Sequence, residues 1–152
     1  MKRLAAILLA LLVAQGVACK KSEPPPPPPA PATVAPTPPP PLAVSAISLG
    51  NAIGADKRVT APLDVFGAKD TIYASVETSG AGHAKVRALW SFVKGEKTAK
   101  VDETTIEFDS SAPAVNEFHV SKPSGWPKGD YKVEIFLGED AAPAMTKSFK
   151  VG

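Results

Sequence analysis

The side chains that could hold a metal ion are few and poorly spaced for the task. The two histidines, His83 in a glycine-rich turn and His119 in an apolar segment, lie far apart in the chain. Zinc bound there without cysteine ligands would also need carboxylates. Four acidic residues offer oxygen ligands of the kind that calcium binds: Asp102, Glu103, Glu107 and Asp109. Their spacing matches no calcium loop, so we interpret them as a solvated strand face and expect neither metal nor cofactor.

The sequence contains no motif typical of nucleophilic or phosphoryl-transfer catalysis. It has no Gly-x-Ser-x-Gly elbow, no glycine loop that cradles phosphate and no His-Glu-x-x-His pair. The hydroxyls of Ser110 and Ser111 follow Asp109, but no base lies near them in the sequence. Catalytic groups can also come from distant parts of a chain. No such set is evident here, and we predict a protein that is not an enzyme.

Cys19 is the one cysteine of the chain, and the residues before it account for its position. Met1-Lys2-Arg3 is a short positive start, and residues 4–14 form an unbroken apolar run of 11 residues. Such a run is typical of a signal peptide and too short for a spanning helix, which needs about 20 residues. Small residues, Gly16-Val17-Ala18, then stand directly before the cysteine.

The run Val17-Ala18-Cys19 resembles the lipobox of bacterial prolipoproteins. The resemblance implies that residues 1–18 are a cleaved signal peptide and that a lipid is attached to the thiol of Cys19. Gly16 departs from the pattern, which usually has leucine or a similar apolar residue there. An ordinary signal peptide with a free cysteine and an uncleaved anchor are the alternatives.

Lipid on Cys19 would hold the protein at a membrane, because several acyl chains contribute about 0.8 kcal/mol for each buried CH₂. Lys20 follows the cysteine, at the position where the sorting rule of Gram-negative lipoproteins uses aspartate to retain a protein in the inner membrane. The resemblance therefore implies an outer-membrane protein that faces the periplasm or the cell surface.

Proline dominates the segment after the cysteine. Twelve of the 17 prolines lie between Pro24 and Pro41. Proline fixes φ and lacks an N–H donor, so neither helix nor sheet forms there. An extended polyproline II chain rises about 3.1 Å per residue, and residues 20–41 could therefore reach roughly 70 Å. We interpret residues 19–41 as a stiff spacer; the alternative is a ligand for a proline-binding module.

Residues 42–152 are long enough for one domain with a core that needs neither disulfide nor metal. Four of the 17 basic residues and one of the 15 acidic residues lie before residue 42, so this part is nearly neutral. A nearly neutral domain has no net field to attract nucleic acid. We therefore expect a monomeric domain that does not bind nucleic acid.

Apolar and polar residues alternate with period two through this domain and predict half-buried strands. The clearest strands are 71–78, 85–93 and 131–137, separated from others by glycine-rich or polar turns. Weaker candidates are 44–49, 98–108 as one strand or two, 115–121 and 145–151. About seven short antiparallel strands with regular turns predict an all-β immunoglobulin-like sandwich.

The run from Trp126 to Val133 supports this fold. Its pattern, W-x-x-G-x-Y-x-V, resembles the start of a late strand in many bacterial immunoglobulin-like domains. Because such domains have unrelated tasks, the resemblance supports the fold and not an activity.

Three aromatic residues invite different interpretations. Trp90 shares an apolar face with its strand neighbours, which predicts core packing. Trp126 precedes Pro127 in a turn, where its ring either caps the sandwich or is exposed to a sugar or a partner protein. Phe136 alternates with the apolar face of its strand and is a second candidate for partner contact.

An anchor, a stiff spacer and a sandwich without catalytic motifs suit a protein that presents a surface at the cell envelope. We expect the membrane, through Cys19, and an unidentified envelope protein as partners. The alternatives are an inhibitor of an envelope or foreign hydrolase, acting through the loop 50–57 or 80–83, and a glycan- or peptidoglycan-binding module acting through Trp126.

The lipobox interpretation predicts the outcome of one substitution. Cys19→Ser should abolish metabolic labelling with fatty acid and release the protein into the soluble fraction, because serine cannot form the thioether. Partition of the serine variant with membranes, at the level of the parent chain, would contradict the interpretation.

Overall fold

The computed structural model describes residues 40–152, and the regular structure in this part is entirely β-strand. The strands are β1 (Ala43–Gly50), β2 (Val65–Phe66), β3 (Ile72–Ser79), β4 (Gly82–Lys94), β5 (Lys97–Ser110), β6 (Ala114–Val120), β7 (Gly129–Leu137) and β8 (Met145–Val151). A helix long and apolar enough to cross a membrane is not found among these residues. The predicted signal peptide, Cys19 and the linker up to residue 39 lie outside the described residues.

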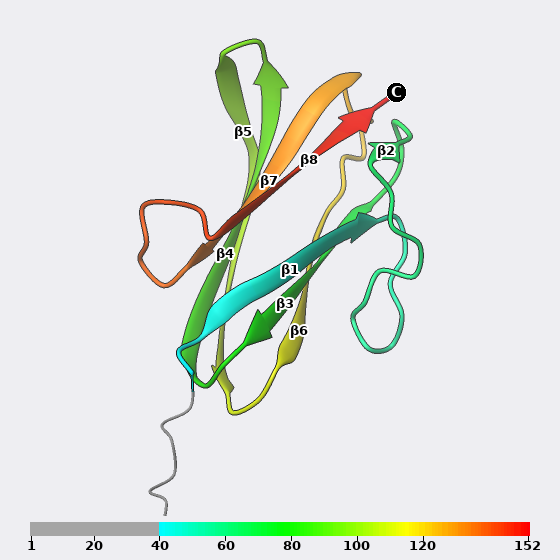
Figure 1. The fold of residues 1–152 in the computed structure, drawn as a ribbon. Helices are drawn as coiled ribbons and strands as arrows, with labels where there is room; N and C mark the ends of the chain where they lie inside the picture. Colours follow the sequence, from blue (N-terminus) through cyan, green and yellow to red (C-terminus); the bar gives the residue numbers. More distant parts are fainter. Residues whose placement is uncertain (1–39) are drawn as a thin grey trace, which may run out of the picture. The chain divides into compact units, whose positions relative to one another are not determined.

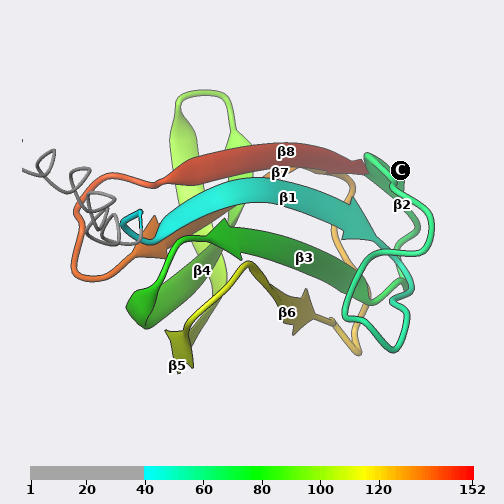
Figure 2. The ribbon, with the colours of Figure 1, turned by 60° about the horizontal axis from the view of Figure 1, so that its bottom comes forward.

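The strands form two sheets that pack face to face (Figure 1, Figure 2). One sheet has the order β1-β3-β6, and the other has the order β2-β8-β7-β4-β5. Neighbouring strands are antiparallel, except that the two residues of β2 run parallel to the end of β8. The predicted immunoglobulin-like sandwich is confirmed, with eight strands where the sequence predicted about seven.

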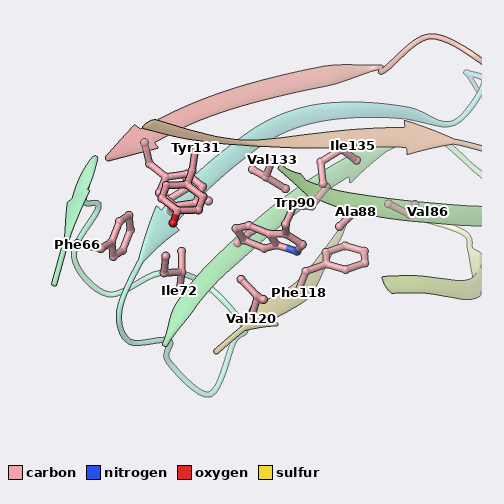
Figure 3. Close-up of a cluster of buried hydrophobic side chains, with 14 of the residues drawn as sticks. Phe66, Ile72, Val86, Ala88, Trp90, Phe118, Val120, Tyr131, Val133 and Ile135 are labelled. Atoms are coloured by element: carbon pink, nitrogen blue, oxygen red, sulfur yellow. The ribbon is translucent and has the colours of Figure 1, made fainter. Parts of the chain in front are cut away.

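Alternate residues of the strands fill the space between the sheets, as the period-two pattern requires. Trp90 of β4 is 1% exposed and lies between the sheets, near Phe118 of β6 (Figure 3). Its ring meets Phe149 of β8 edge-on, with 6.0 Å between ring centroids. The predicted inward faces of the strands that contain Trp90 and Tyr131 are therefore correct.

The sequence left residues 98–108 open as one strand or two, and the structure has one long strand there. β5 pairs with β4 along its whole length, but the register shifts between Trp90 and Ser91. Asp102 faces Trp90 and Lys100 faces Ser91, so Val101 is an extra residue, a β-bulge. The bulge breaks the alternation of this segment, which explains why the pattern suggested an interruption.

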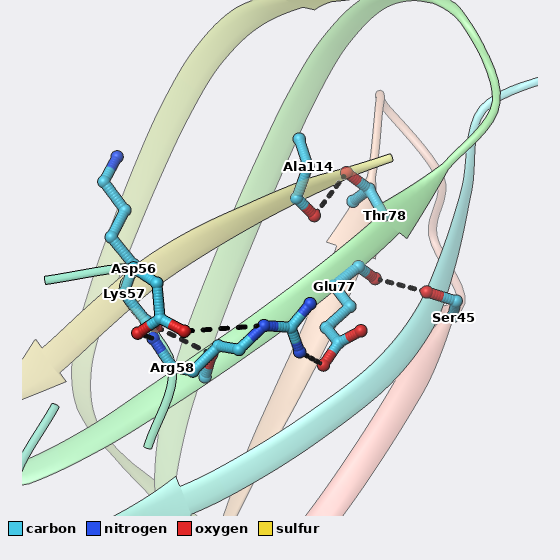
Figure 4. Close-up of polar contacts among 8 residues, drawn as sticks. Ser45, Asp56, Lys57, Arg58, Glu77, Thr78 and Ala114 are labelled. Carbon is cyan, nitrogen blue, oxygen red and sulfur yellow. Dashed lines mark hydrogen bonds and ion pairs between the residues drawn. The ribbon is translucent and has the colours of Figure 1, made fainter. Parts of the chain in front are cut away.

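Residues 51–64 connect the two sheets, and Lys57 and Arg58 of this segment lie against the outer face of β3 (Figure 4). The Ser75 hydroxyl donates a hydrogen bond to the Lys57 carbonyl oxygen at 2.8 Å, and Arg58 forms an ion pair with Glu77. Lys57 has a φ of 62°, a left-handed conformation that is uncommon for a residue with a side chain. The contacts with β3 hold this turn against the sheet.

Packing around Trp90 predicts a large loss of stability on truncation. Trp90→Ala should lower the free energy of unfolding by about 3–5 kcal/mol, because it leaves a cavity between the sheets. A small domain has roughly 5–15 kcal/mol in total, so this variant should be close to unfolded. Denaturant titration followed by circular dichroism measures the effect.

The matched control is Trp90→Phe. Its smaller ring keeps part of the packing, and it removes the indole N–H, which has no hydrogen-bond partner among the described residues. An unpaired buried donor is destabilising, so the phenylalanine variant should lose much less than the alanine variant. Equal stability of the alanine variant and the parent would mean that the inward face of β4 is assigned wrongly.

Candidate functional site

Trp126 closes one end of the sandwich instead of offering an exposed ring. Only 4% of it is exposed, and its indole N–H donates a hydrogen bond to the Asp70 carbonyl oxygen at 2.9 Å. Its ring meets Tyr131 edge-on at 5.5 Å between centroids. The hypothesis of an exposed Trp126 for sugar or partner contact is therefore wrong, because the ring is needed to cover the core.

Tyr131 completes this corner. Its hydroxyl donates a hydrogen bond to the Pro127 carbonyl oxygen at 2.7 Å, four residues earlier. Burial raises the pKa of the Tyr131 phenol, so the hydroxyl keeps its proton at neutral pH. Gly129 has a φ of +148°, and a Cβ there would lie 2.7 Å from the ring of Phe92. The residues of the W-x-x-G-x-Y pattern thus pack against one another and against the core at one corner of the sandwich.

Phe136 lies on the outer face of the five-stranded sheet, as its alternation predicted, but it is only 6% exposed. The guanidinium carbon of Arg87, its neighbour on β4, lies 4.0 Å from the centroid of the Phe136 ring. A cation over an aromatic face is a favourable contact. A partner on this face would therefore contact Arg87 first. The prediction of Phe136 as an exposed contact residue is wrong: its ring packs beneath the Arg87 guanidinium.

Ion pairs cross the same outer face. Glu103 accepts hydrogen bonds from Lys100 and from Arg87. These two contacts, Lys100 first, hold the pKa of the Glu103 carboxyl below its usual value. A lowered carboxyl pKa stabilises the fold above the usual pKa, and the contribution is lost as pH falls through the lowered value. Because Glu103 pairs with both Lys100 and Arg87, the charges of these three side chains are paired with one another on this face.

The histidines and the acidic stretch are dispersed. His83 on β4 lies 3.0 Å from Asp109, whereas His119 on β6, in the other sheet, lies 3.1 Å from Glu117. In the part of the chain from residue 40 onward, no three histidine, cysteine or acidic side chains gather as a metal site would require. The acidic stretch lies along β5: Asp102 and Glu103 are half-buried, and the exposed Glu107 and Asp109 alternate with half-buried apolar residues.

The two loops expected to serve an inhibitor are attached to the body of the domain. The loop 50–57 is held by the hydrogen bond from Ser75 to the carbonyl of Lys57. In the turn 80–83, the Ala81 N–H donates to the Pro40 carbonyl oxygen at 3.2 Å. These contacts attach the two loops to the domain, while residues 51–52 and 55–57 of the first loop are exposed.

An open groove lies between the edge of the five-stranded sheet and the end of β6 together with the β6–β7 segment, residues 121–128. It consists of two adjoining hollows of about 340 Å³ and 250 Å³, and both are lined by Val101 and Lys122. The larger hollow also contains Asp102 and His119. We call these two hollows together the edge groove.

The smaller hollow of the edge groove has an apolar floor. Phe92 and Trp126 line it together with Pro127, which is exposed, and Lys100 lies at its side. The sequence did not predict this groove, because its lining comes from segments far apart in the chain. The irregular alternation at Val101 was the one signal in the sequence that pointed to it.

A third hollow, of about 640 Å³, lies along β8 beside Asp64 and Val65. Val65 is 61% exposed and is the large apolar residue that stands out on the surface of the described residues. The charges here are paired, Lys147 with Asp64 and Lys150 with Asp130. This hollow therefore offers one apolar contact but no unpaired charge to select a ligand.

No protein-family model matches the chain, and no curated protein matches it in sequence. Among solved structures, the β-glucosidase EmGH1 from Erythrobacter marinus matches with a TM-score of 0.49 and 11% identity, over 73% of this chain and 15% of that chain. The alkylpurine DNA glycosylase AlkC from Pseudomonas fluorescens matches with a TM-score of 0.45 and 11% identity, over 72% of this chain and 30% of that one.

A β-glucosidase from Listeria innocua, in complex with glucose, matches with a TM-score of 0.44 and 9% identity, over 73% of this chain and 16% of that chain. The chain thus spans less than a third of each of these proteins. Likenesses at this level carry no argument about what this protein does.

The packed corner predicts how Trp126 affects stability and binding. Trp126→Ala should lower the free energy of unfolding by about 3–5 kcal/mol, because a cavity forms and the Asp70 carbonyl loses its donor. Because the same ring lines the smaller hollow of the edge groove, binding of a partner should fall together with stability and not without it. Thermal unfolding and partner binding are measured on the same preparation.

Tyr131→Phe is the matched variant at this corner. It keeps the ring and removes one hydrogen bond, so it should lose only about 0.5–1.5 kcal/mol. Unchanged stability of Trp126→Ala combined with weaker binding would contradict the capping role and restore the contact role.

Proposed function

We propose that this protein is a lipid-anchored lipoprotein of the bacterial outer membrane that displays a noncatalytic β-sandwich to bind another envelope protein. Cys19 would carry the lipid, and residues 19–41 would hold the domain away from the membrane. The lipobox resemblance and the proline tract support the anchor and the spacer. The confirmed sandwich supplies a rigid body for display.

The edge groove is the observation that carries the binding role. Most of the buried residues between the sheets are apolar, and the two histidines lie on different sheets. The edge groove, in contrast, combines an apolar floor with charged sides at the rim of a sheet. A surface of this composition suits protein recognition better than catalysis.

The two alternatives have weaker support. A glycan-binding module would need an exposed aromatic platform, and both Trp126 and Phe136 are covered. A hydrolase inhibitor would need a protruding rigid loop, and the two candidate loops are attached to the sheet or to Pro40. Protein binding through the groove is the role that the exposed residues favour.

A capture experiment tests the proposed function. The full chain, tagged at its C-terminus and solubilised in detergent, is incubated with envelope extract from its own source. We expect one protein to be retained at a constant molar ratio, and no retention by the destabilised variant Trp90→Ala. Retention on purified peptidoglycan without any protein partner would contradict protein binding and favour the glycan alternative.

A further inference from the structure

The edge groove lies beside a strand with an unpaired side. β5 is the last strand of its sheet and pairs only with β4 among the described strands. Its other side therefore presents backbone N–H and C=O groups without a strand partner, which is a template for an additional strand. The 14 residues of β5 form the longest strand of this domain, so the template is long enough for a peptide.

The bulge in β5 occurs where the strand meets the groove. Val101 is the extra residue of the bulge and lines both hollows. Bulges bend a strand and redirect a side chain, and they are frequent beside functional sites. Here Val101, half-buried, packs against the core and extends the apolar floor formed by Phe92 and Trp126.

The charges around the groove favour an acidic ligand. Lys100 and Lys122 lie at its sides, and both are exposed. Lys122 takes part in none of the ion pairs found between residues 40 and 152, whereas Lys100 contacts Glu103 on the outer face of the sheet. Asp102 is the one acidic residue in the lining.

We propose that the edge groove binds an extended, acidic segment of the partner protein, which adds to the free side of β5. Backbone hydrogen bonds to β5 would supply affinity, as in other cases of strand addition. An apolar side chain of the segment would rest on Val101 and Pro127, and its carboxylates would meet Lys122 and, in exchange for Glu103, Lys100. The inference rests on the proposed function and specifies its surface and its partner.

An acidic polypeptide suits the groove better than an anionic polysaccharide. A polysaccharide has no backbone N–H and C=O groups at strand spacing, so it cannot use the free side of β5. Its sugar rings would also need an exposed aromatic face, and Trp126 is 4% exposed. The free strand edge therefore decides between the two classes of polymer.

The test is peptide binding to the full chain in detergent micelles. The probe is a fluorescent ten-residue peptide in which Glu alternates with Val, and binding is followed by fluorescence anisotropy. We expect saturable binding that weakens as salt is raised, because the lysines are exposed. Lys100→Glu together with Lys122→Glu should weaken binding about tenfold or more, which corresponds to about 1.4 kcal/mol.

Asp102→Asn should strengthen binding, because it removes the one negative charge from the lining. Lys150→Glu is the matched control on the protein: it reverses an exposed lysine that pairs with Asp130 and lies on β8, three strands away from β5 in the same sheet. Its affinity for the peptide should remain within about twofold of the parent value, because Lys150 is exposed and does not line the groove.

Two control peptides separate charge from strand addition. Replacing each Glu with Gln should reduce affinity as the lysine variants do. Methylating alternate backbone nitrogens keeps the charge but removes N–H donors, and it should abolish binding if the peptide pairs with β5. Equal binding of the methylated peptide, or equal binding to the double lysine variant, would overturn the inference. Absence of binding by the parent chain would also overturn it.

The capture experiment, repeated with the double lysine variant, separates this inference from the proposed function. If the parent and the double variant retain the same envelope protein equally well, the groove is not the site, although protein binding stands. If the acidic peptide binds but no envelope protein is retained by the parent, the groove binds strands and the proposed function fails.

Discussion

The structure depends on a cluster of aromatic rings in which Tyr131 is the central member. Phe92, Trp126 and Phe149 surround it at centroid distances of 4.9, 5.5 and 5.4 Å. These rings come from β4, the β6–β7 segment and β8, so the cluster joins parts that no local pairing would connect. Edge-to-face and offset contacts add to the burial of large apolar area.

The hydroxyl group of the Tyr131 side chain explains why the cluster fixes the β6–β7 segment as well as strands. Its hydroxyl must find an acceptor when the ring is buried, and the carbonyl of Pro127 supplies it. Trp126 meets the same requirement through the carbonyl of Asp70. Both hydrogen bonds end on irregular backbone, so burial of the rings also sets the path of the segment that forms one wall of the edge groove.

The sequence predicted the sheet framework because the relevant signal is local. Period-two alternation requires only that one face of a strand meets the core, and it located the strands around Trp90 and Tyr131 correctly. β2 was not predicted, because two residues are too short to show a period. Its pairing with β8 depends on distant residues, as shown by the hydrogen bond from the Lys150 N–H to the Asp64 carbonyl.

The candidate site was predicted less well, for a different physical reason. Exposure is a property of the folded surface, and long side chains can cover an aromatic ring that lies on an outer face. Arg87 does this to Phe136, and the loop that contains Asp70, far away in the sequence, contacts Trp126 in the same way. The free edge of β5 and the position of Lys122 beside it depend on the strand order, which the sequence pattern does not predict.

Hydrogen–deuterium exchange on the full chain, with and without the acidic peptide, tests the central claim that β5 and its groove are the surface displayed to a partner. Amides on the free side of an edge strand exchange readily and become protected when a strand is added. The account predicts new protection confined to β5 near Val101 and to residues 121–128. Protection along β8 beside Val65 instead, or unchanged exchange in β5 at saturating peptide, would contradict it.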